Sequence, residues 1–250
     1  MNFLDLDLDF FQNDIAHGAD DYGKRLDDSF TTPWKEEKLI KFLEIKLGLN
    51  KINKIKGRIV THHNEVFYLW RELIISDKLD IPFQVTHIDA HSDLGLGDGS
   101  WHYLMTEYIH RDYEERIYPE NIKYPSKIYK FGYGNYLAFA IACNWIRNIE
   151  FIVPSMWSND FPISLLKDYD DNTKTIQLKK FDRGKSLDFH LLKEYEPVCY
   201  EKEVPFEIYK ENDFEAKKQF DYIALSTSPG YTVKDSDKLI DIISDYIDFI

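Results

Sequence analysis

The sequence predicts an α/β fold with a mostly parallel sheet, and three observations lead to that prediction. Short apolar segments alternate along the chain with longer segments of helical period. The apolar segments are rich in Ile, Val, Leu and Phe, as buried parallel strands tend to be. The chain has 250 residues, 44% of them hydrophobic, and no long linker rich in Gly, Ser or Pro divides it. It can therefore bury a large core, and we expect a single domain over residues 1–250.

The predicted elements alternate between the two periods in chain order. Apolar or alternating runs predict strands at residues 2–9, 57–61, 83–88, 150–153, 175–178 and 222–226. Helical periods predict helices at residues 34–47, 65–75, 102–110, 135–147 and 236–249. Two segments, 113–131 and the charged stretch 181–218, show no clean period. We interpret them as irregular insertions or a peripheral subdomain.

Charge and cysteine content exclude several classes of protein. The formal net charge is −13, from 31 Lys and Arg against 44 Asp and Glu, so we expect nucleic acid to be repelled and a cationic partner to be attracted. Cys143 and Cys199 lack CxxC spacing and the start of the chain is not signal-like, which favours reduced thiols in a cytoplasmic protein. Cys143 is expected to be inert core packing. No apolar run approaches the roughly 18 residues of a membrane span. A homo-oligomer is compatible with the sequence.

Two acidic clusters follow predicted strands. Asp89, His91 and Asp93 alternate where one strand ends, so their side chains can converge on one point. Asp7 and Asp9 do the same at the end of the first strand. In open α/β sheets this edge carries the functional crevice. An acidic surface turn or a helix cap is the structural alternative, but carboxylates on a buried strand are costly without a cation.

A histidine from a third strand end completes the predicted metal site. Either His62 or His63 can serve, and we prefer His63 because it lies nearer the helix start. The set contains no thiolate, which suits Mn(II) or another hard divalent ion. Its carboxylates imply two ions, about 3.5 to 4 Å apart if one or two carboxylates bridge. We expect Asp5 to support the site or face solvent, and His87 to be a hydrogen-bonding neighbour. The predicted ligands are Asp7, Asp9, His63, Asp89, His91 and Asp93.

These motifs resemble those of a known superfamily. Residues 87–93, His-Ile-Asp-Ala-His-Ser-Asp, resemble the Asp-Ala-His-Thr/Ser-Asp signature of the arginase and agmatinase superfamily, and Asp7-Leu8-Asp9 resembles its Asp-x-Asp signature. Together with residues 6–11 and 63–66, they are most similar to an arginase-like family that includes peptide arginases. The resemblance covers about the first hundred residues, and more weakly residues 132–153 and 226–232.

The resemblance implies a fold and an activity. The implied fold is a three-layer α/β/α arginase/deacetylase-like domain, here with a permuted motif order because the Asp-x-Asp element comes first. The usual Gly-Gly-Asp-His context is also replaced, by His62-His63, and Phe10-Phe11 replaces the usual continuation toward Asp-Pro. The implied activity is conversion of arginine side chains in a ribosomally made precursor peptide to ornithine, with release of urea. The implied cofactor is a pair of Mn(II) ions that share a bridging hydroxide.

Further residues are assigned roles by this interpretation. His102, which follows a Gly-rich loop at 95–100, is the expected proton shuttle for the leaving amine, although a plain helix-start histidine explains it equally. Asp98 or Glu107 could pair with the guanidinium of the substrate. Ser228 and Tyr231 could line the substrate pocket, or could simply belong to a Pro-Gly turn.

The sequence is also compatible with other functions. A related metal-dependent amidohydrolase or deacylase would use a similar Asp/His site, usually with one zinc ion and fewer carboxylates. A binuclear phosphoesterase is less favoured because no basic cluster lies near the motifs. From a different class, the chain could be a non-catalytic, metal-stabilised protein that binds a peptide.

Overall fold

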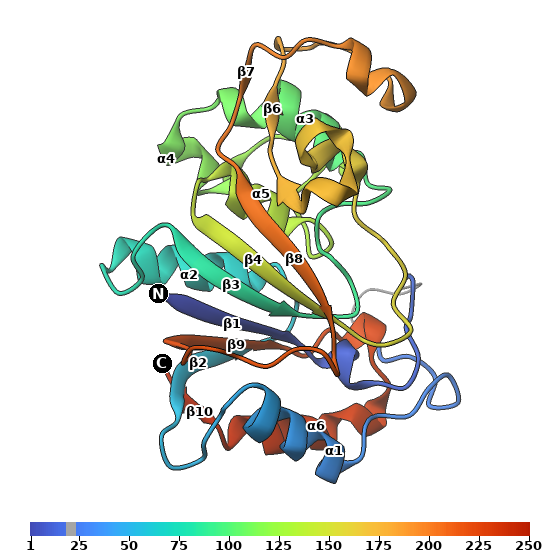
Figure 1. Ribbon diagram of the computed structural model, residues 1–250, viewed down its shortest axis with the longest axis vertical. Coiled ribbons are helices and arrows are strands. Elements are labelled where there is room, and N and C mark those ends of the chain that lie inside the picture. Colours follow the sequence, from blue (N-terminus) through green and yellow to red (C-terminus); the bar gives the residue numbers. More distant parts are fainter. Residues whose placement is uncertain (19–23) are drawn as a thin grey trace.

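An eight-stranded, mostly parallel sheet forms the centre of the protein (Figure 1). The computed structural model describes residues 1–18 and 24–250. The strand order is β10-β2-β9-β1-β3-β4-β8-β5, and every neighbouring pair is parallel except β5 and β8. The strands are β1 (Asn2–Asp7), β2 (Ile55–Val60), β3 (Phe83–Ile88), β4 (Ile146–Val153), β5 (Thr175–Ile176), β8 (Val204–Lys210), β9 (Tyr222–Ser226) and β10 (Ile247–Phe249). A separate two-stranded ribbon pairs β6 (Lys179–Lys180) with β7 (Cys199–Tyr200).

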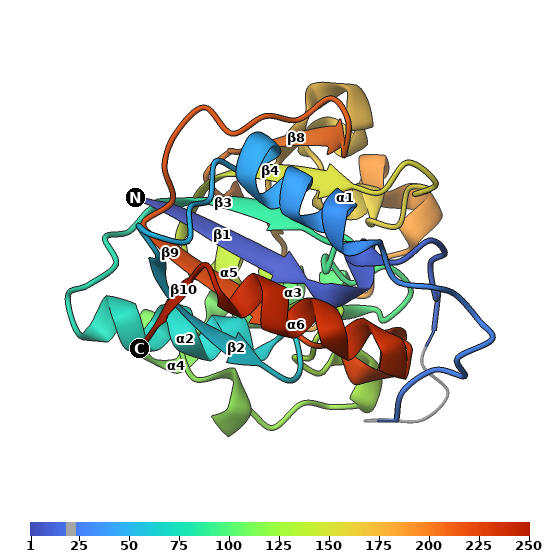
Figure 2. The same ribbon diagram turned by 90° about the horizontal axis from the view of Figure 1, so that it is seen from below.

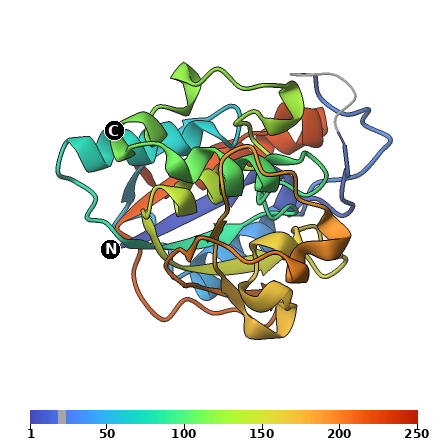
Figure 3. The same ribbon diagram turned by 90° about the horizontal axis from the view of Figure 1, so that it is seen from above.

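Helices cover both faces of this sheet, an arrangement consistent with the predicted three layers. One face carries α1 (Glu36–Lys41), its π-helical continuation Phe42–Lys46, and α6 (Asp237–Ser244), which lie nearest the viewer in Figure 2. The other carries α2 (Glu65–Ile75), α3 (Ser100–Thr106), α4 (Tyr113–Arg116) and α5 (Tyr136–Ala142), and Figure 3 looks down on the green helices among them. Short 3-10 turns occur at Leu8–Phe11, Tyr108–His110, Pro119–Asn121, Lys127–Tyr129, Ile163–Leu165, Lys167–Tyr169, Asp171–Thr173, Phe189–Glu194, Pro229–Tyr231 and Lys234–Ser236. Among the described residues, no helix is both long and apolar enough to cross a membrane.

Alternation along β1 places the acidic residues on one face of the sheet. Leu4 and Leu6 belong to the apolar core beneath α1 and α6, whereas Phe3 belongs to the core beneath α2 and α5. Because successive side chains in a strand point to opposite faces, Asp5 and Asp7 project to the same side as Phe3. Both are almost completely buried. A central strand therefore carries two carboxylates into the interior, which is costly unless partners compensate.

The predicted elements are largely present, with shifted boundaries. The strands at 83–88 and 222–226 and the helix at 65–75 agree with β3, β9 and α2 at both ends. The strand predicted at 2–9 ends at Asp7, because the chain turns there into a 3-10 turn. The helices predicted at 135–147 and 236–249 are too long: each run of apolar residues contains a helix followed closely by a strand, β4 and β10 respectively.

The segments without a clean period need one correction. The stretch 181–218 was interpreted as an irregular insertion or a peripheral subdomain, but it contains β8, which pairs in parallel with β4 in the main sheet. In β8, four of seven residues are polar or charged or are proline, and several side chains are exposed, so its sequence lacks the apolar run of a buried strand. The strand predicted at 175–178 is only the two-residue antiparallel edge strand β5. Residues 113–131 form short helical turns.

Candidate metal centre

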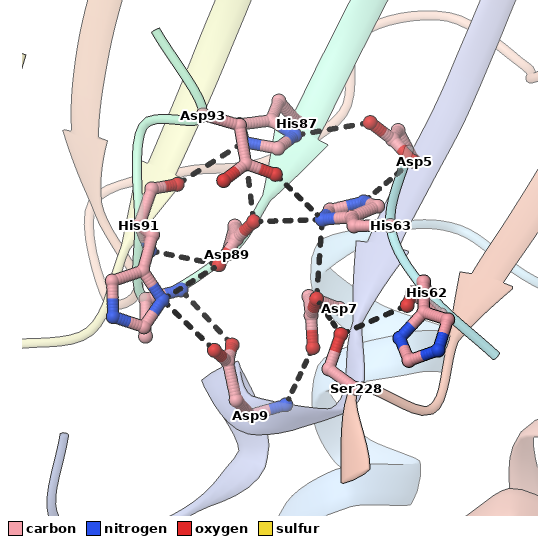
Figure 4. Close-up of polar contacts among 12 residues, drawn as sticks. Asp5, Asp7, Asp9, His62, His63, His87, Asp89, His91, Asp93 and Ser228 are labelled. Atoms are coloured by element: carbon pink, nitrogen blue, oxygen red, sulfur yellow. Dashed lines mark hydrogen bonds and ion pairs between the residues drawn. The ribbon is translucent and has the colours of Figure 1, made fainter. Parts of the chain in front are cut away.

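All six predicted ligands surround one cavity of about 380 Å³ at the carboxyl ends of the central strands (Figure 4). Two of them come from the end of β1, one from the turn between β2 and α2, and three from the loop after β3. The loop after β9 forms a further wall. Parallel strands bring their carboxyl ends to one edge of the sheet, so segments far apart in sequence meet here. The six residues are Asp7, Asp9, His63, Asp89, His91 and Asp93.

The local backbone aims these side chains inward. Asp7 begins a 3-10 turn, and its Oδ1 accepts a hydrogen bond of 3.0 Å from the backbone N–H of Asp9. Asp89 Oδ1 likewise accepts from the N–H of His91 at 2.7 Å. Asp93 has a φ of 50°, a left-handed conformation that Asp tolerates better than most residues. The chain therefore turns sharply after β3 and brings the Asp93 carboxylate back toward Asp89.

One ring nitrogen of His63 lies among three carboxylates. His63 Nδ1 is 3.1 Å from an oxygen of Asp7, 3.0 Å from one of Asp89 and 2.9 Å from one of Asp93. None of these contacts has hydrogen-bond geometry, so His63 Nδ1, Asp89 Oδ2 and Asp93 Oδ2 are buried without a hydrogen-bond partner. Buried polar atoms are rarely left unsatisfied in this way. Together with Asp7 Oδ2, which accepts from Ser228, these three atoms form a buried polar group that could hold a cation.

Asp5 explains why His63 presents that particular nitrogen. The other ring nitrogen, Nε2, lies 3.0 Å from Asp5 Oδ1. A carboxylate only accepts hydrogen bonds, so Nε2 carries the proton and a neutral His63 has its lone pair at Nδ1. Asp5 also accepts from His87 Nδ1 at 3.0 Å and from the Tyr136 hydroxyl. Burial opposes ionisation of Asp5, but His63 and His87 hold the pKa of this carboxyl well below its ordinary value.

A second cluster forms around His91. His91 Nδ1 lies 2.9 Å from Asp9 Oδ2 and 3.7 Å from Asp89 Oδ1, while its Nε2 lies 2.9 Å from the backbone carbonyl of Ala16. The carbonyl can only accept, so Nε2 again carries the proton and a neutral ring directs Nδ1 toward the carboxylates. Asp89 contributes one oxygen to each cluster. It therefore links the two clusters.

The arrangement of donor atoms could hold a metal ion. In an octahedral complex with metal–ligand distances of about 2.1 Å, neighbouring ligand atoms lie about 3.0 Å apart. The contacts of His63 Nδ1 all lie within 0.1 Å of that value. Groups of three residues whose ligand atoms could hold an ion include Asp7, His63 and Asp89, and also Asp9, Asp89 and His91. Oxygen and imidazole donors without sulfur favour a hard or borderline ion.

The pKa values of the same groups are shifted in the direction that favours bound positive charge. Burial and the nearby Asp89 raise the pKa of Asp93 to about 7. Burial together with Asp7 and Asp89 raises the pKa of Asp9 well above its ordinary value. Burial disfavours the charged form of His91, yet the carboxylates of Asp9 and Asp89 raise the pKa of the ring well above its ordinary value. Without a metal, protons must neutralise this cluster.

Two residues that the sequence assigned to substrate binding do reach the cavity. Ser228 lies in its wall with a φ of 36°, and its hydroxyl donates to Asp7 Oδ2. Tyr231 also lines the cavity, with its ring centroid 5.0 Å from that of His91. Gln12 fixes this loop, because its side-chain amide donates to the Tyr231 carbonyl at 2.7 Å. Ser228 therefore lines the cavity and also donates a hydrogen bond to Asp7, one of the predicted ligands.

Three other predicted residues, His102, Glu107 and Asp98, do not line the cavity. His102 Nε2 lies 3.0 Å from the Lys185 carbonyl, because α3 turns the ring toward the segment 181–187. Glu107 accepts from the Gly184 N–H at 2.8 Å. Asp98 accepts from the Ser100 N–H and the Asn135 side chain, so it stabilises the start of α3. Of the described histidines outside the ligand set, His17 and His62 line the cavity.

Of three further residues at or behind the site, two were anticipated and one was not. Asp5 was expected to support the site or face solvent, and it is fully buried at the centre of a hydrogen-bonded group. His87 was correctly expected to form hydrogen bonds. Asp160 was not anticipated: it lines the cavity, and its carboxylate accepts from the Ser92 N–H at 2.9 Å. Its only sequence signal was its place after the predicted strand at 150–153.

Comparison with known proteins gives no independent assignment. No protein-family model matches this chain, and no similar curated protein or solved structure was found.

Proposed function

We propose that this protein is a binuclear manganese hydrolase that converts arginine side chains of a peptide to ornithine and releases urea. The observation that carries the proposal is His63 Nδ1, which lies 2.9 to 3.1 Å from three buried carboxylate oxygens without a hydrogen bond to any of them. The second cluster at His91 supports a second ion that shares Asp89. The resemblance of both acidic motifs to arginase signatures supports the choice of reaction.

The lining of the cavity supports a cationic substrate. Beyond the proposed ligands it includes the carboxylate of Asp160 and the rings of Tyr133 and Tyr231. Carboxylates and aromatic faces both attract a guanidinium group. The protein as a whole has a net charge of −13, which also favours a cationic partner.

The same lining favours arginine within a peptide over the free amino acid. Among the described residues that line the cavity, none is Lys or Arg. Free arginine carries an α-carboxylate, which would meet aspartates here without a cationic partner. In a peptide this carboxylate is an amide and carries no charge. The unfavourable interaction is then absent.

Asp5, Ser228 and Tyr231 each support the proposed chemistry in a different way. When bound, two divalent ions would lower the pKa of water toward neutrality and supply the hydroxide that hydrolyses the guanidinium. Asp5 holds the proton on Nε2 of His63, which leaves Nδ1 free to bind metal. Ser228 restrains the carboxylate of Asp7 through its hydroxyl hydrogen bond. Tyr231 packs beside His91 and limits the space around the second cluster.

The test is urea release after loading with Mn(II). The substrates are free arginine and a capped tripeptide, N-acetyl-Gly-Arg-Gly-amide, and mass spectrometry follows the conversion of arginine to ornithine. We expect release of urea from the tripeptide, with kcat/KM at least about tenfold above that for free arginine, because an unpaired charge opposes binding. Asp93→Asn should abolish turnover, and Asp80→Asn, at an exposed position, should retain it. Absence of urea from both substrates with manganese, iron or cobalt would reject the proposal.

A further inference from the structure

A second cavity adjoins the candidate metal centre. It has a volume of about 320 Å³, close to that of the first cavity and within the range of ligand-binding pockets. Its walls come from α2 and from the segment 119–133. His62 and Tyr133 line both cavities, and their rings stack with centroids 6.5 Å apart. This ring pair is therefore a shared wall, with the metal ligands on one side of it.

Aromatic and aliphatic groups dominate the second cavity. Tyr68 and Phe131 pack with ring centroids 5.8 Å apart, and Ile122 and Tyr124 add to the apolar lining. The Tyr124 hydroxyl donates to the Pro119 carbonyl at 3.2 Å, so its polar end already has a partner. The remaining ring surface is apolar. Such a lining favours an apolar group over a charged one.

The two charged side chains that line the second cavity, Glu120 and Lys130, leave it mainly apolar. Glu120 is already paired with Arg71, at 2.7 Å between Oε1 and Nη1. Lys130 is exposed. The acidic character of the first cavity therefore does not continue into the second one. A ligand that occupies both must present a cation to one cavity and an apolar group to the other.

We infer that the second cavity binds the apolar side chain of a residue next to the modified arginine in the peptide. The inference rests on the proposed function, because that function supplies the cationic residue in the first cavity. Two side chains of neighbouring residues in an extended peptide point away from each other, and a shared wall between two cavities can separate them. Free arginine has no group that would fill the second cavity.

The test uses peptides that bind but cannot be hydrolysed. Capped pentapeptides with ornithine at the centre carry Leu, Asp or Gly at the residue before or after it, and calorimetry measures their Kd for the manganese-loaded protein. We expect Leu at one of these positions to bind roughly tenfold more tightly than Gly, and Asp more weakly still. Equal affinity for all three residues at both positions would overturn the inference.

Variants connect this preference to the second cavity. Ile122→Ala should reduce the preference for Leu to about twofold, because it removes apolar contact area. Ile122→Trp, which fills the cavity, should abolish it. Ile128→Ala is the matched control at an exposed position outside both cavities, and it should retain the full preference. Melting temperatures establish that each variant is folded. A full preference in both Ile122 variants would overturn the inference.

Arginine versions of the same peptides separate this inference from the proposed function. A preference for Leu in the binding experiment without urea release would retain the second cavity and reject hydrolysis. Urea release with equal kcat/KM for every neighbour would retain hydrolysis and reject the second cavity. Tight binding of free arginine that weakens in Lys130→Met would show that the cavity serves an α-carboxylate, which would also overturn the inference.

Discussion

Asp5 Oδ1 lies 3.0 Å from His63 Nε2, and this contact determines which nitrogen of His63 faces the cavity. Both side chains are buried, at 0% and 2% exposure. A buried carboxylate on a central strand therefore orients a histidine from a different strand end. Such pairs are common behind metal-binding histidines, where they fix the tautomer and raise the basicity of the ligand.

Substitution of Asp5 should weaken metal binding without removing a ligand. In Asp5→Asn, the neutral amide replaces the negative charge that stabilises the proton on His63 Nε2. The NH₂ group of the amide is also a donor and can face the ring in place of the oxygen. We expect manganese affinity to fall by about 10- to 100-fold. Calorimetric titration of the metal-free protein measures the change. The exposed Asp80→Asn is the control, and equal affinity in both variants would contradict the role of Asp5.

Removal of one carboxylate should stabilise the metal-free protein. Burial and Asp89 raise the pKa of Asp93 to about 7, so its ionised form is unfavourable in the folded state at pH 8. We therefore expect Asp93→Asn to raise the stability of the chelator-treated protein by about 1 kcal/mol or more. In the Asp93→Asn variant, Mn(II) should raise the melting temperature much less than it does in the unsubstituted protein. Differential scanning calorimetry with and without Mn(II) checks both signs.

His102 should be dispensable for turnover. Its Nε2 lies 3.0 Å from the Lys185 carbonyl, and the ring does not line the cavity. His102→Ala should keep kcat within about twofold, and should lower stability by roughly 1 kcal/mol through the lost hydrogen bond and packing. Urea kinetics and thermal unfolding measure the two effects. A large fall in kcat with unchanged stability would restore His102 as the proton shuttle.

Lys179 should give the protein a pH-dependent stability away from the candidate site. Its ammonium is buried among backbone carbonyls, including that of Gln177 at 3.0 Å, and burial lowers its pKa to about 8 from an ordinary value of 10.5. Between these two values the unfolded chain binds more protons than the folded one, so the free energy of unfolding should rise with pH. We expect a rise on the order of 1 to 3 kcal/mol between about pH 8 and 10.

The variant Lys179→Met isolates this effect from other groups that titrate in the same range. Urea denaturation of both proteins across pH 8 to 10 gives the difference in slope. The rise attributed to Lys179 should be absent from the variant. Parallel curves for the two proteins would show that the lysine does not titrate in this window.

The sequence was most informative where spacing alone determines geometry. Asp89, His91 and Asp93 follow a buried strand, and Asp7 and Asp9 follow another, so convergence at one edge of a parallel sheet could be predicted. The preference for His63 over His62 agrees with the structure, because its ring nitrogen lies among the carboxylates. His62 instead stacks on Tyr133 at the cavity wall.

The sequence was less informative where distant contacts decide the outcome. Asp5 became the centre of a buried group only because β1 pairs with β3, which sets Asp5 opposite His87. The orientation of His102 depends on the segment 181–187, whose path has no local signal. β8 escaped prediction because its exposed polar residues hide the pattern of a strand in the main sheet.

The most direct test of the candidate metal centre is the position of manganese in crystals grown with Mn(II), located by anomalous scattering. We predict two peaks about 3.5 to 4 Å apart, with Asp89 between them. One peak should lie within bonding distance of His63 Nδ1, and the other within bonding distance of His91 Nδ1. Crystals that bind manganese at neither nitrogen would contradict the claim that these buried residues form a metal centre.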